Sequence, residues 1–105
     1  MRDSMAAVEA FGDRKTCERV LGMFSLFSNE KRFKILCVLS ESDLCASEIA
    51  RLIEGKRSNV SQQLKLLTLA GYLEKRREER SIFYHLKDQK IKKILHFLKR
   101  EFVQD

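Results

Sequence analysis

The chain has 105 residues, enough for one domain with a modest hydrophobic core. Apolar residues make up 44% and charged residues 34%, and neither a membrane-spanning run nor a secretory signal is recognisable, so we expect a cytoplasmic globular protein without a membrane partner. Twenty-one Lys and Arg against fifteen Asp and Glu leave a net charge of +6, which favours a nucleic acid as partner.

The first third of the chain predicts two helices after a weakly patterned start. Residues 1–14 are expected to fray or to form a short helix. Over residues 15–27 apolar side chains recur on one helical face; they are Cys17, Val20, Leu21, Phe24 and Phe27. Ser28 or Asn29 can cap the next helix, which we expect to end near Ser40. Its apolar residues are Phe33, Ile35, Leu36, Val38 and Leu39.

Residues 46–70 predict two helices joined by a tight turn. A short extended piece at Leu44 precedes them. Ser47 and Glu48 open the first helix, and Gly55 is expected to end it. The residues of this helix that should face inward are Ile49, Leu52 and Ile53. Such a pair of helices is typical of a helix–turn–helix.

The second of these helices, over residues 57–70, carries a clear buried stripe. Val60, Leu64 and Leu67 are spaced at i, i+4 and i+7, which places them on one face. Gly71 follows the helix at a position suited to a left-handed C-cap. The helix should therefore have one buried face and one free face.

Residues 72–86 predict a β-hairpin, and a last helix follows it. "YLEKRR" and "SIFYHL" alternate and are rich in aromatic residues, so they should pair around Glu78-Glu79. Asp88 can cap a helix over residues 88–103, whose apolar face holds Ile91, Ile94, Leu95, Leu98 and Phe102. The whole order predicts a single, mainly α domain over residues 1–105, a winged helix–turn–helix of about five helices plus a wing.

A recognition helix hides one face and offers the other to DNA bases. Opposite the stripe of Val60, Leu64 and Leu67, the N-terminal half of the helix carries Arg, Ser and Gln, which pair with guanine, adenine and phosphate. The helix N-terminus also attracts phosphate, and the bases of the wing can lie along the DNA backbone. The predicted DNA contacts are Lys56, Arg57, Ser58, Asn59, Ser61, Gln62, Lys65, Lys75, Arg76, Arg77 and Arg80.

The charge is concentrated in the same segment. Residues 51–80 hold eight Lys and Arg and four Asp and Glu, which leaves +4 of the chain's total of +6. Ordinary solvated surfaces are also charged, and many basic proteins bind no nucleic acid. Combined with the helix–turn–helix spacing, however, the charge favours contact with double-stranded DNA.

Two segments resemble the ArsR/SmtB family of bacterial winged-helix repressors. "FSNEKRFKILCVL" resembles the part before the reading head, and "SEIARLIEGKRSNVSQQLKLLTLAGYLEKRREERSIFYHL" resembles the recognition helix and wing. The resemblance covers roughly residues 20–100 and is strongest to the HlyU and BigR branch. Two departures stand out: Lys56 replaces the usual serine at the start of the recognition helix, and the wing tip lacks the frequent glycine.

The resemblance implies a homodimeric repressor that binds an inverted-repeat operator. The helices at 15–27 and 88–103 would form the dimer interface. Independently, their apolar stripes are too large for a small monomer to cover easily. The predicted interface residues are Val20, Phe24, Phe27, Ile91, Leu95, Leu98 and Phe102.

Family members commonly release DNA when a ligand binds, but the metal motifs are incomplete in this chain. Cys45 matches the first cysteine of the family's Cys-x-Cys thiolate site, while Ser47 stands at the second position. In the zinc site on the last helix, Asp88 survives but Lys90 takes a ligand position. We expect no zinc site and no cofactor, and a thiophilic metal is left open only if other cysteines join Cys45.

Thiol chemistry is the remaining sensor hypothesis. The resemblance matches Cys37 to a cysteine that pairs with a second one near the C-terminus, but Val103 occupies the partner position. Cys37 would have to act with Cys17 or Cys45, or alone through oxidation or persulfidation. The alternative is that Cys37 and Cys17 are small apolar packing residues.

No glycine-rich phosphate loop or acid–base pair suggests an enzyme. Two alternatives to an inducible DNA-binding regulator stay open. One is a winged-helix module that binds protein, and the other is a constitutive DNA binder without an inducer.

Overall fold

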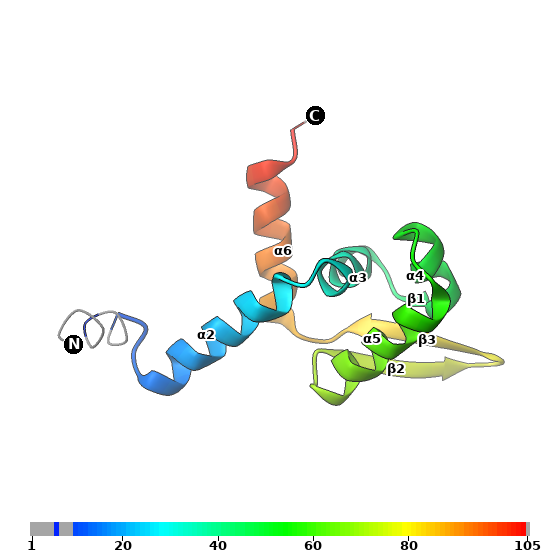
Figure 1. Ribbon diagram of the computed structural model, residues 1–105, viewed down its shortest axis with the longest axis horizontal. Coiled ribbons are helices and arrows are strands. Elements are labelled where there is room, and N and C mark those ends of the chain that lie inside the picture. The colour runs from blue at the N-terminus through cyan, green and yellow to red at the C-terminus, as the bar shows by residue number, and fades with distance from the viewer. Residues whose placement is uncertain (1–5, 7–9, 105) are drawn as a thin grey trace.

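The computed structural model describes residue 6 and residues 10–104. The expected frayed end over residues 1–14 falls largely outside them. The helices are α2 (Arg14–Phe27), α3 (Glu30–Glu41), α4 (Ala46–Leu52), α5 (Arg57–Leu69) and α6 (Gln89–Phe102), and the strands are β1 (Leu44–Cys45), β2 (Leu73–Glu78) and β3 (Ser81–Leu86). The expected order of helices, helix–turn–helix, hairpin and helix is confirmed (Figure 1). No described helix is both long enough and apolar enough to cross a membrane.

Side-chain caps set the starts of three helices. Asp13 accepts a hydrogen bond of 2.7 Å from the backbone N–H three residues further on, at the start of α2. Asn29, not Ser28, does the same for α3, at 3.0 Å. Asp88 accepts from two backbone N–H groups at the start of α6. Each cap satisfies donors that the first turn of a helix leaves without a partner.

The turn between α4 and α5 differs from the prediction in two ways. The left-handed residue is Glu54, with φ of 55°, and not Gly55. Gly55 has a steric role instead, because a Cβ there would lie 3.3 Å from a Val60 methyl group. Leu52, expected to face inward, is 53% exposed. The buried face of α4 includes Ala50, which moves the centre of that face away from Leu52.

The end of α5 forms as the sequence predicts. Gly71 has φ of 90°, its N–H donates to the Thr68 carbonyl, and the N–H of Tyr72 donates to the Leu67 carbonyl, both at 3.1 Å. These two bonds define a Schellman motif, which needs a left-handed residue that glycine adopts without strain. The chain thereby leaves α5 and enters β2 within a few residues.

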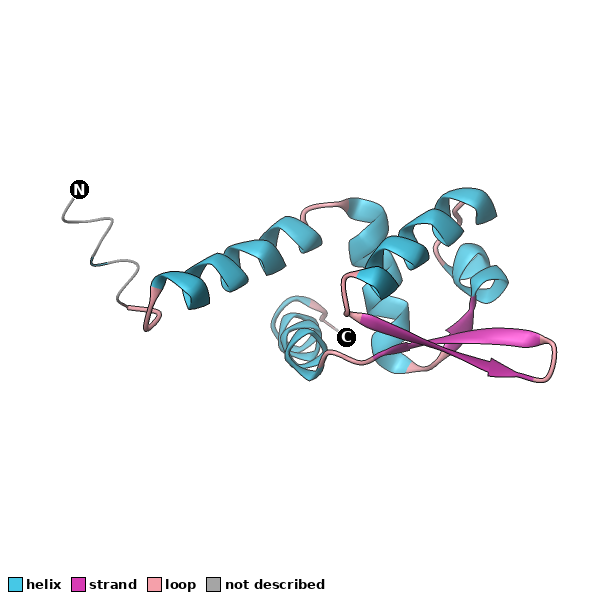
Figure 2. Cartoon of the chain, turned by 90° about the horizontal axis from the view of Figure 1, so that it is seen from below, coloured by secondary structure: helices cyan, strands magenta, loops and turns pink. Residues whose placement is uncertain are grey.

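The wing is a three-stranded antiparallel sheet in the order β1-β3-β2. Strands β2 and β3 pair along their whole length, from Leu73 opposite Leu86 to Glu78 opposite Ser81. A two-residue loop, Glu79-Arg80, joins them, and Glu79 takes the positive φ of 55° that such a loop demands. The hairpin extends beyond the helices, as Figures 1 and 2 show.

The core lies where α3, α5, the root of the wing and the first half of α6 meet. Its buried side chains are Leu26, Ile35, Leu36, Leu39, Ile49, Ala50, Val60, Leu64, Leu67, Leu73, Leu86, Ile91 and Leu95. The predicted stripe of α5 is confirmed. Phe27 and Phe33 hold the end of α2 against α3 through an edge-to-face contact with ring centroids 6.1 Å apart.

Helices α2 and α6 project from this body in different directions (Figures 1 and 2). Phe24 on α2 is 67% exposed and Phe102 on α6 is 78% exposed. Ile91 and Leu95, predicted to lie at a dimer interface, are instead buried in the protomer's own core. The reason is that the first half of α6 packs on α3, so only its second half is free.

Candidate nucleic-acid interface

The outer face of α5 presents polar side chains to solvent. Because Val60, Leu64 and Leu67 are buried, the residues between them on the opposite face must point away from the core. Arg57 and Gln62 are both exposed. The other exposed residues of this face are Ser58, Ser61 and Lys65, while Asn59 is partly buried. The structure thus brings the predicted base-reading residues together on one helix face.

The N-terminus of α5 has no side-chain cap. Lys56 occupies the N-cap position and makes no capping hydrogen bond, and the first backbone bond runs from the Val60 N–H to the Lys56 carbonyl. The N–H groups of residues 57–59 therefore have no partner within the helix. Free N–H groups and the positive end of the helix dipole attract an anion such as a phosphate.

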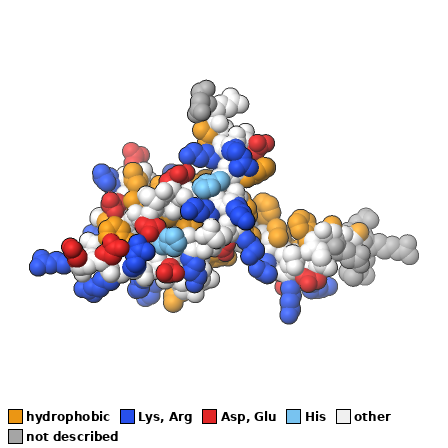
Figure 3. Space-filling model, turned by 180° about the vertical axis from the view of Figure 1, so that it is seen from behind, with side chains coloured by type: hydrophobic (Ala, Val, Ile, Leu, Met, Phe, Trp, Pro, Cys, Tyr) orange, Lys and Arg blue, Asp and Glu red, His pale blue; other side chains and the backbone are white. Residues whose placement is uncertain are grey.

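The bases of the wing lie on two opposite faces. Side chains alternate along a strand, so Lys75 and Arg77 share one face and Arg76 points to the other. Arg80 lies in the loop at the tip. Basic side chains project from the wing end of the molecule, with acidic ones between them (Figure 3).

Arg76 is held by two carboxylates, which separates it from the other predicted contacts. Its Nη2 lies 3.1 Å from Oδ2 of Asp43 and its Nε lies 3.0 Å from Oε1 of Glu78. An arginine engaged in this way has little charge left for a phosphate. The prediction of Arg76 as a DNA contact is therefore not supported by its surroundings.

Asp43 links the wing to the end of α3. Besides Arg76, its Oδ1 lies 2.8 Å from Nδ1 of His85 on β3. The hydrogen bond from His85, together with that from Arg76, holds the pKa of the Asp43 carboxyl below its ordinary value. The sequence offered no signal for this link, because Asp43 and His85 are 42 positions apart and no spacing rule connects them.

Sequence similarity identifies the class of protein. The profile described as "Bacterial regulatory protein, arsR family" matches residues 29–75, from the cap of α3 into β2. The transcriptional activator HlyU of Vibrio cholerae is 29% identical over 90 residues, which cover 86% of this chain and 83% of HlyU. A CadC homologue of Staphylococcus aureus, a cadmium resistance regulatory protein, is 34% identical over 77 residues, 72% of this chain and 64% of the relative.

The chain belongs to the arsR family. Solved structures agree: reduced HlyU from Vibrio cholerae superposes with a TM-score of 0.78 at 29% identity, covering 86% of this chain and 95% of that chain. The transcriptional repressor BigR from Xylella fastidiosa superposes with a TM-score of 0.79 at 26% identity, covering 100% and 99%. The predicted winged helix–turn–helix fold and the predicted family are thus confirmed, and the chain is a transcription regulator.

Against this family background, the cysteines are well separated in the fold. All three are free and partly buried; Cys17 lies on the projecting α2 and Cys45 caps α4 beside the sheet. Cys37 lines a cavity that Val103 also lines, so the residue at the expected partner position is indeed near it. Burial raises the pKa of the Cys37 thiol, and the charge of Glu41 raises it further.

Metal-binding groups do not assemble in the described part of the chain. There, no three His, Cys, Asp or Glu side chains come together as a set that could hold an ion. Asp88 is engaged in capping α6, and the Cys45 sulfur lies 3.2 Å from the Ser47 hydroxyl. A metal at Cys45 would need donors that the described fold does not bring near it.

Proposed function

We propose that this arsR-family regulator binds an inverted-repeat operator as a homodimer and represses transcription from it. Each α5 would enter one major groove, and the two wings would lie along the flanking backbone. Arg57, Ser61 and Gln62 would contact base edges, while Lys56, Lys65, Lys75 and Arg77 would neutralise phosphates. Arg76 is omitted because Asp43 and Glu78 already hold it.

The orientation of α5 carries this proposal. Its apolar stripe is fully buried, with Leu64 at 0% exposure, so its polar face has a fixed direction. Its N-terminus offers unpartnered N–H groups beside Arg57. A polar, basic helix face with a free N-terminus is what entry into a major groove requires.

The projecting helices support the dimer. Phe24, Phe102 and Leu21 expose large apolar side chains on α2 and the second half of α6, and apolar side chains are visible along both helices (Figure 3). A second copy would cover these surfaces, as isologous dimers do. A twofold dimer would place two recognition helices one helical turn of DNA apart.

Release from DNA by thiol oxidation, persulfidation or a thiophilic metal is the inducer part of the proposal. A raised pKa lowers the thiolate fraction of Cys37, and the thiolate is the reactive form. Cys45, at the entrance of α4 in the helix–turn–helix, is therefore the better-placed sensor thiol. Its modification would act next to α5.

A gel-shift assay on DNA upstream of the chain's own gene tests the proposal. We expect a shift that survives competitor DNA, and loss of that shift with polysulfide, peroxide, zinc or arsenite if a thiol senses them. Cys37→Ser and Cys45→Ser identify the thiol. No shift at low salt with any upstream fragment would contradict DNA binding and favour a protein-binding module; a shift indifferent to every reagent would indicate a constitutive binder.

A further inference from the structure

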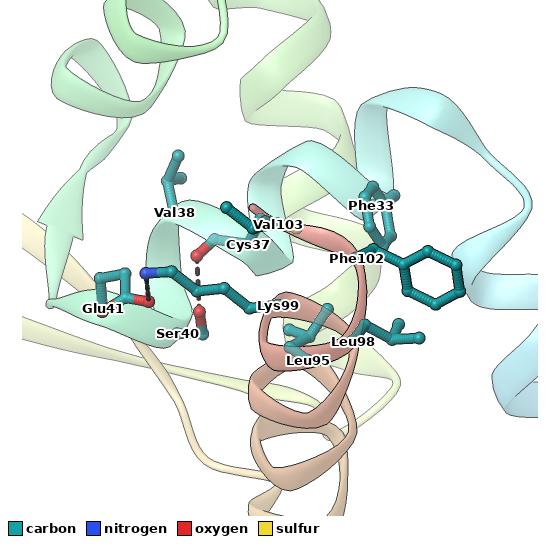
Figure 4. Close-up of a pocket in the computed structure, with 10 residues that line it drawn as sticks. All are labelled: Phe33, Cys37, Val38, Ser40, Glu41, Leu95, Leu98, Lys99, Phe102 and Val103. Atoms are coloured by element: carbon teal, nitrogen blue, oxygen red, sulfur yellow. Dashed lines mark hydrogen bonds and ion pairs between the residues drawn. The ribbon is translucent and has the colours of Figure 1, made fainter. Parts of the chain in front are cut away.

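A cavity of about 550 Å³ lies between α3 and the second half of α6. Its walls are mainly apolar and include Phe33, Val38, Leu95 and Leu98, as Figure 4 shows. Burying an apolar group there would remove it from water without displacing any core side chain. Its size falls in the range of protein sites for small organic ligands.

A second, polar cavity adjoins the first at its outer end. The two share Glu41, Lys99 and Val103, and the second also includes His96 and Arg100. An apolar chamber therefore opens directly onto a rim that carries two permanent positive charges. We name the apolar chamber and its basic rim together the α3–α6 site.

We propose that the α3–α6 site binds a small amphipathic carboxylate, with its apolar body in the chamber and its carboxylate on Lys99 and Arg100. A neutral apolar molecule would leave the basic rim unused. A small inorganic anion would leave the chamber unused. The juxtaposition of both surfaces selects a ligand that has both parts.

The charges of the rim are available to such a ligand. Lys99 forms an ion pair of 3.2 Å with Glu41, but both side chains are more than half exposed, and such pairs are weak. Arg100 stacks on the Phe97 ring at 5.8 Å, and no carboxylate among the described residues lies within ion-pair distance of it. A guanidinium binds a carboxylate through two parallel hydrogen bonds.

This inference goes beyond the proposed function and does not depend on DNA binding. A direct binding experiment with the full chain tests it, with octanoate, 1-octanol and acetate compared by calorimetry. We expect octanoate to bind about tenfold more tightly than 1-octanol, because one charge-assisted hydrogen bond contributes that much, and acetate not to bind. Equal affinity of octanoate and 1-octanol, or no binding of octanoate, would overturn the proposal; the second result is expected if a second copy of the chain fills the chamber.

Variants locate the ligand. Lys99→Gln with Arg100→Gln should reduce octanoate affinity about tenfold and leave 1-octanol binding unchanged, while Lys93→Gln, an exposed lysine nearer the start of the same helix, should change neither. Glu41→Gln should strengthen octanoate binding, because it frees Lys99. A weakening by Glu41→Gln would show that the rim does not receive the carboxylate.

Cys37 provides a second readout, because it lines the chamber. Octanoate should slow alkylation of Cys37 by N-ethylmaleimide, followed by peptide mass, and should leave the rates at Cys17 and Cys45 unchanged. Equal protection of all three cysteines would indicate a general effect on the fold and would contradict the site. Leu98→Phe, which fills the chamber, should abolish the protection in a protein whose circular dichroism is unchanged.

Discussion

Arg76 and Arg77 are neighbours on β2 with different surroundings. Arg76 is paired with Asp43 and Glu78, while Arg77 shows no ion pair with any residue that the structure describes. We predict that Arg77→Ala weakens binding to all DNA and reduces the slope of log K against log salt by about 0.9, the value for one lost phosphate contact. Fluorescence anisotropy over a series of salt concentrations measures this slope.

Arg76→Ala is the matched control for that measurement. Its side chain has the same chemistry and lies one residue away, but its charge is engaged by carboxylates. The slope should therefore remain at the wild-type value. An equal reduction in both variants would mean that the Asp43 contact opens when DNA binds.

Base reading belongs to individual residues of α5. We predict that Arg57→Ala and Gln62→Ala each cost about 1–3 kcal/mol of operator affinity and relax the preference between operator and unrelated sequences. Competition gel shifts with single-base operator variants measure this preference. Unchanged operator preference in both variants would show that another surface reads the bases.

At the level of elements, the position of α5 depends on its buried stripe. Leu64→Ala removes a side chain with no exposed surface, and we predict a loss of about 2–5 kcal/mol in the free energy of unfolding. Leu69→Ala on the same helix removes a side chain that is 76% exposed and should change stability by less than about 0.5 kcal/mol. Urea denaturation followed by circular dichroism compares the two.

The wing is joined to the helical body through Asp43, and this link depends on pH. The pKa of Asp43 is lowered in the folded protein from 3.8, so the ionised form stabilises the fold at neutral pH. That contribution is lost as the pH falls through the folded-state pKa, below 3.8. Asp43→Asn should therefore be less stable than wild type at pH 7, and the difference should disappear in acid.

Urea denaturation at several pH values measures the difference in unfolding free energy between Asp43→Asn and wild type. Glu74→Gln, on the same face of the wing but without a hydrogen bond to Asp43 in the described structure, is the control and should not show this pattern. A stability difference that persists below the folded-state pKa would assign the effect to side-chain geometry and not to charge.

At the level of the whole molecule, the projecting helices determine assembly. We predict that Phe24→Ser and Phe102→Ser each weaken self-association by about 2 kcal/mol, as loss of an aromatic anchor at an interface does. Sedimentation equilibrium measures this. Leu69→Ser removes an equally exposed apolar residue from α5 and should leave association unchanged; a wild-type chain that is monomeric at all concentrations would contradict the dimer.

Local sequence rules predicted most of the elements. The spacing of Val60, Leu64 and Leu67 predicted which face of α5 is buried, and Gly71 predicted where it ends, because both depend on neighbours within one or two helical turns. The helix–turn–helix, the wing and the family all followed from this local pattern. Leu52 was wrongly predicted to face inward, because the buried face of a short helix depends on what packs against it.

Only the tertiary structure decided which exposed charges are free and which apolar residues are available. It placed Asp43 beside Arg76 and His85, and it buried Ile91 and Leu95 in the protomer while leaving Phe102 outside. It also brought α3 and α6 together around a cavity with a basic rim. The physical reason is the same in each case: sequence periodicity determines the face of an element, whereas the partner of that face is a distant segment that only folding brings near.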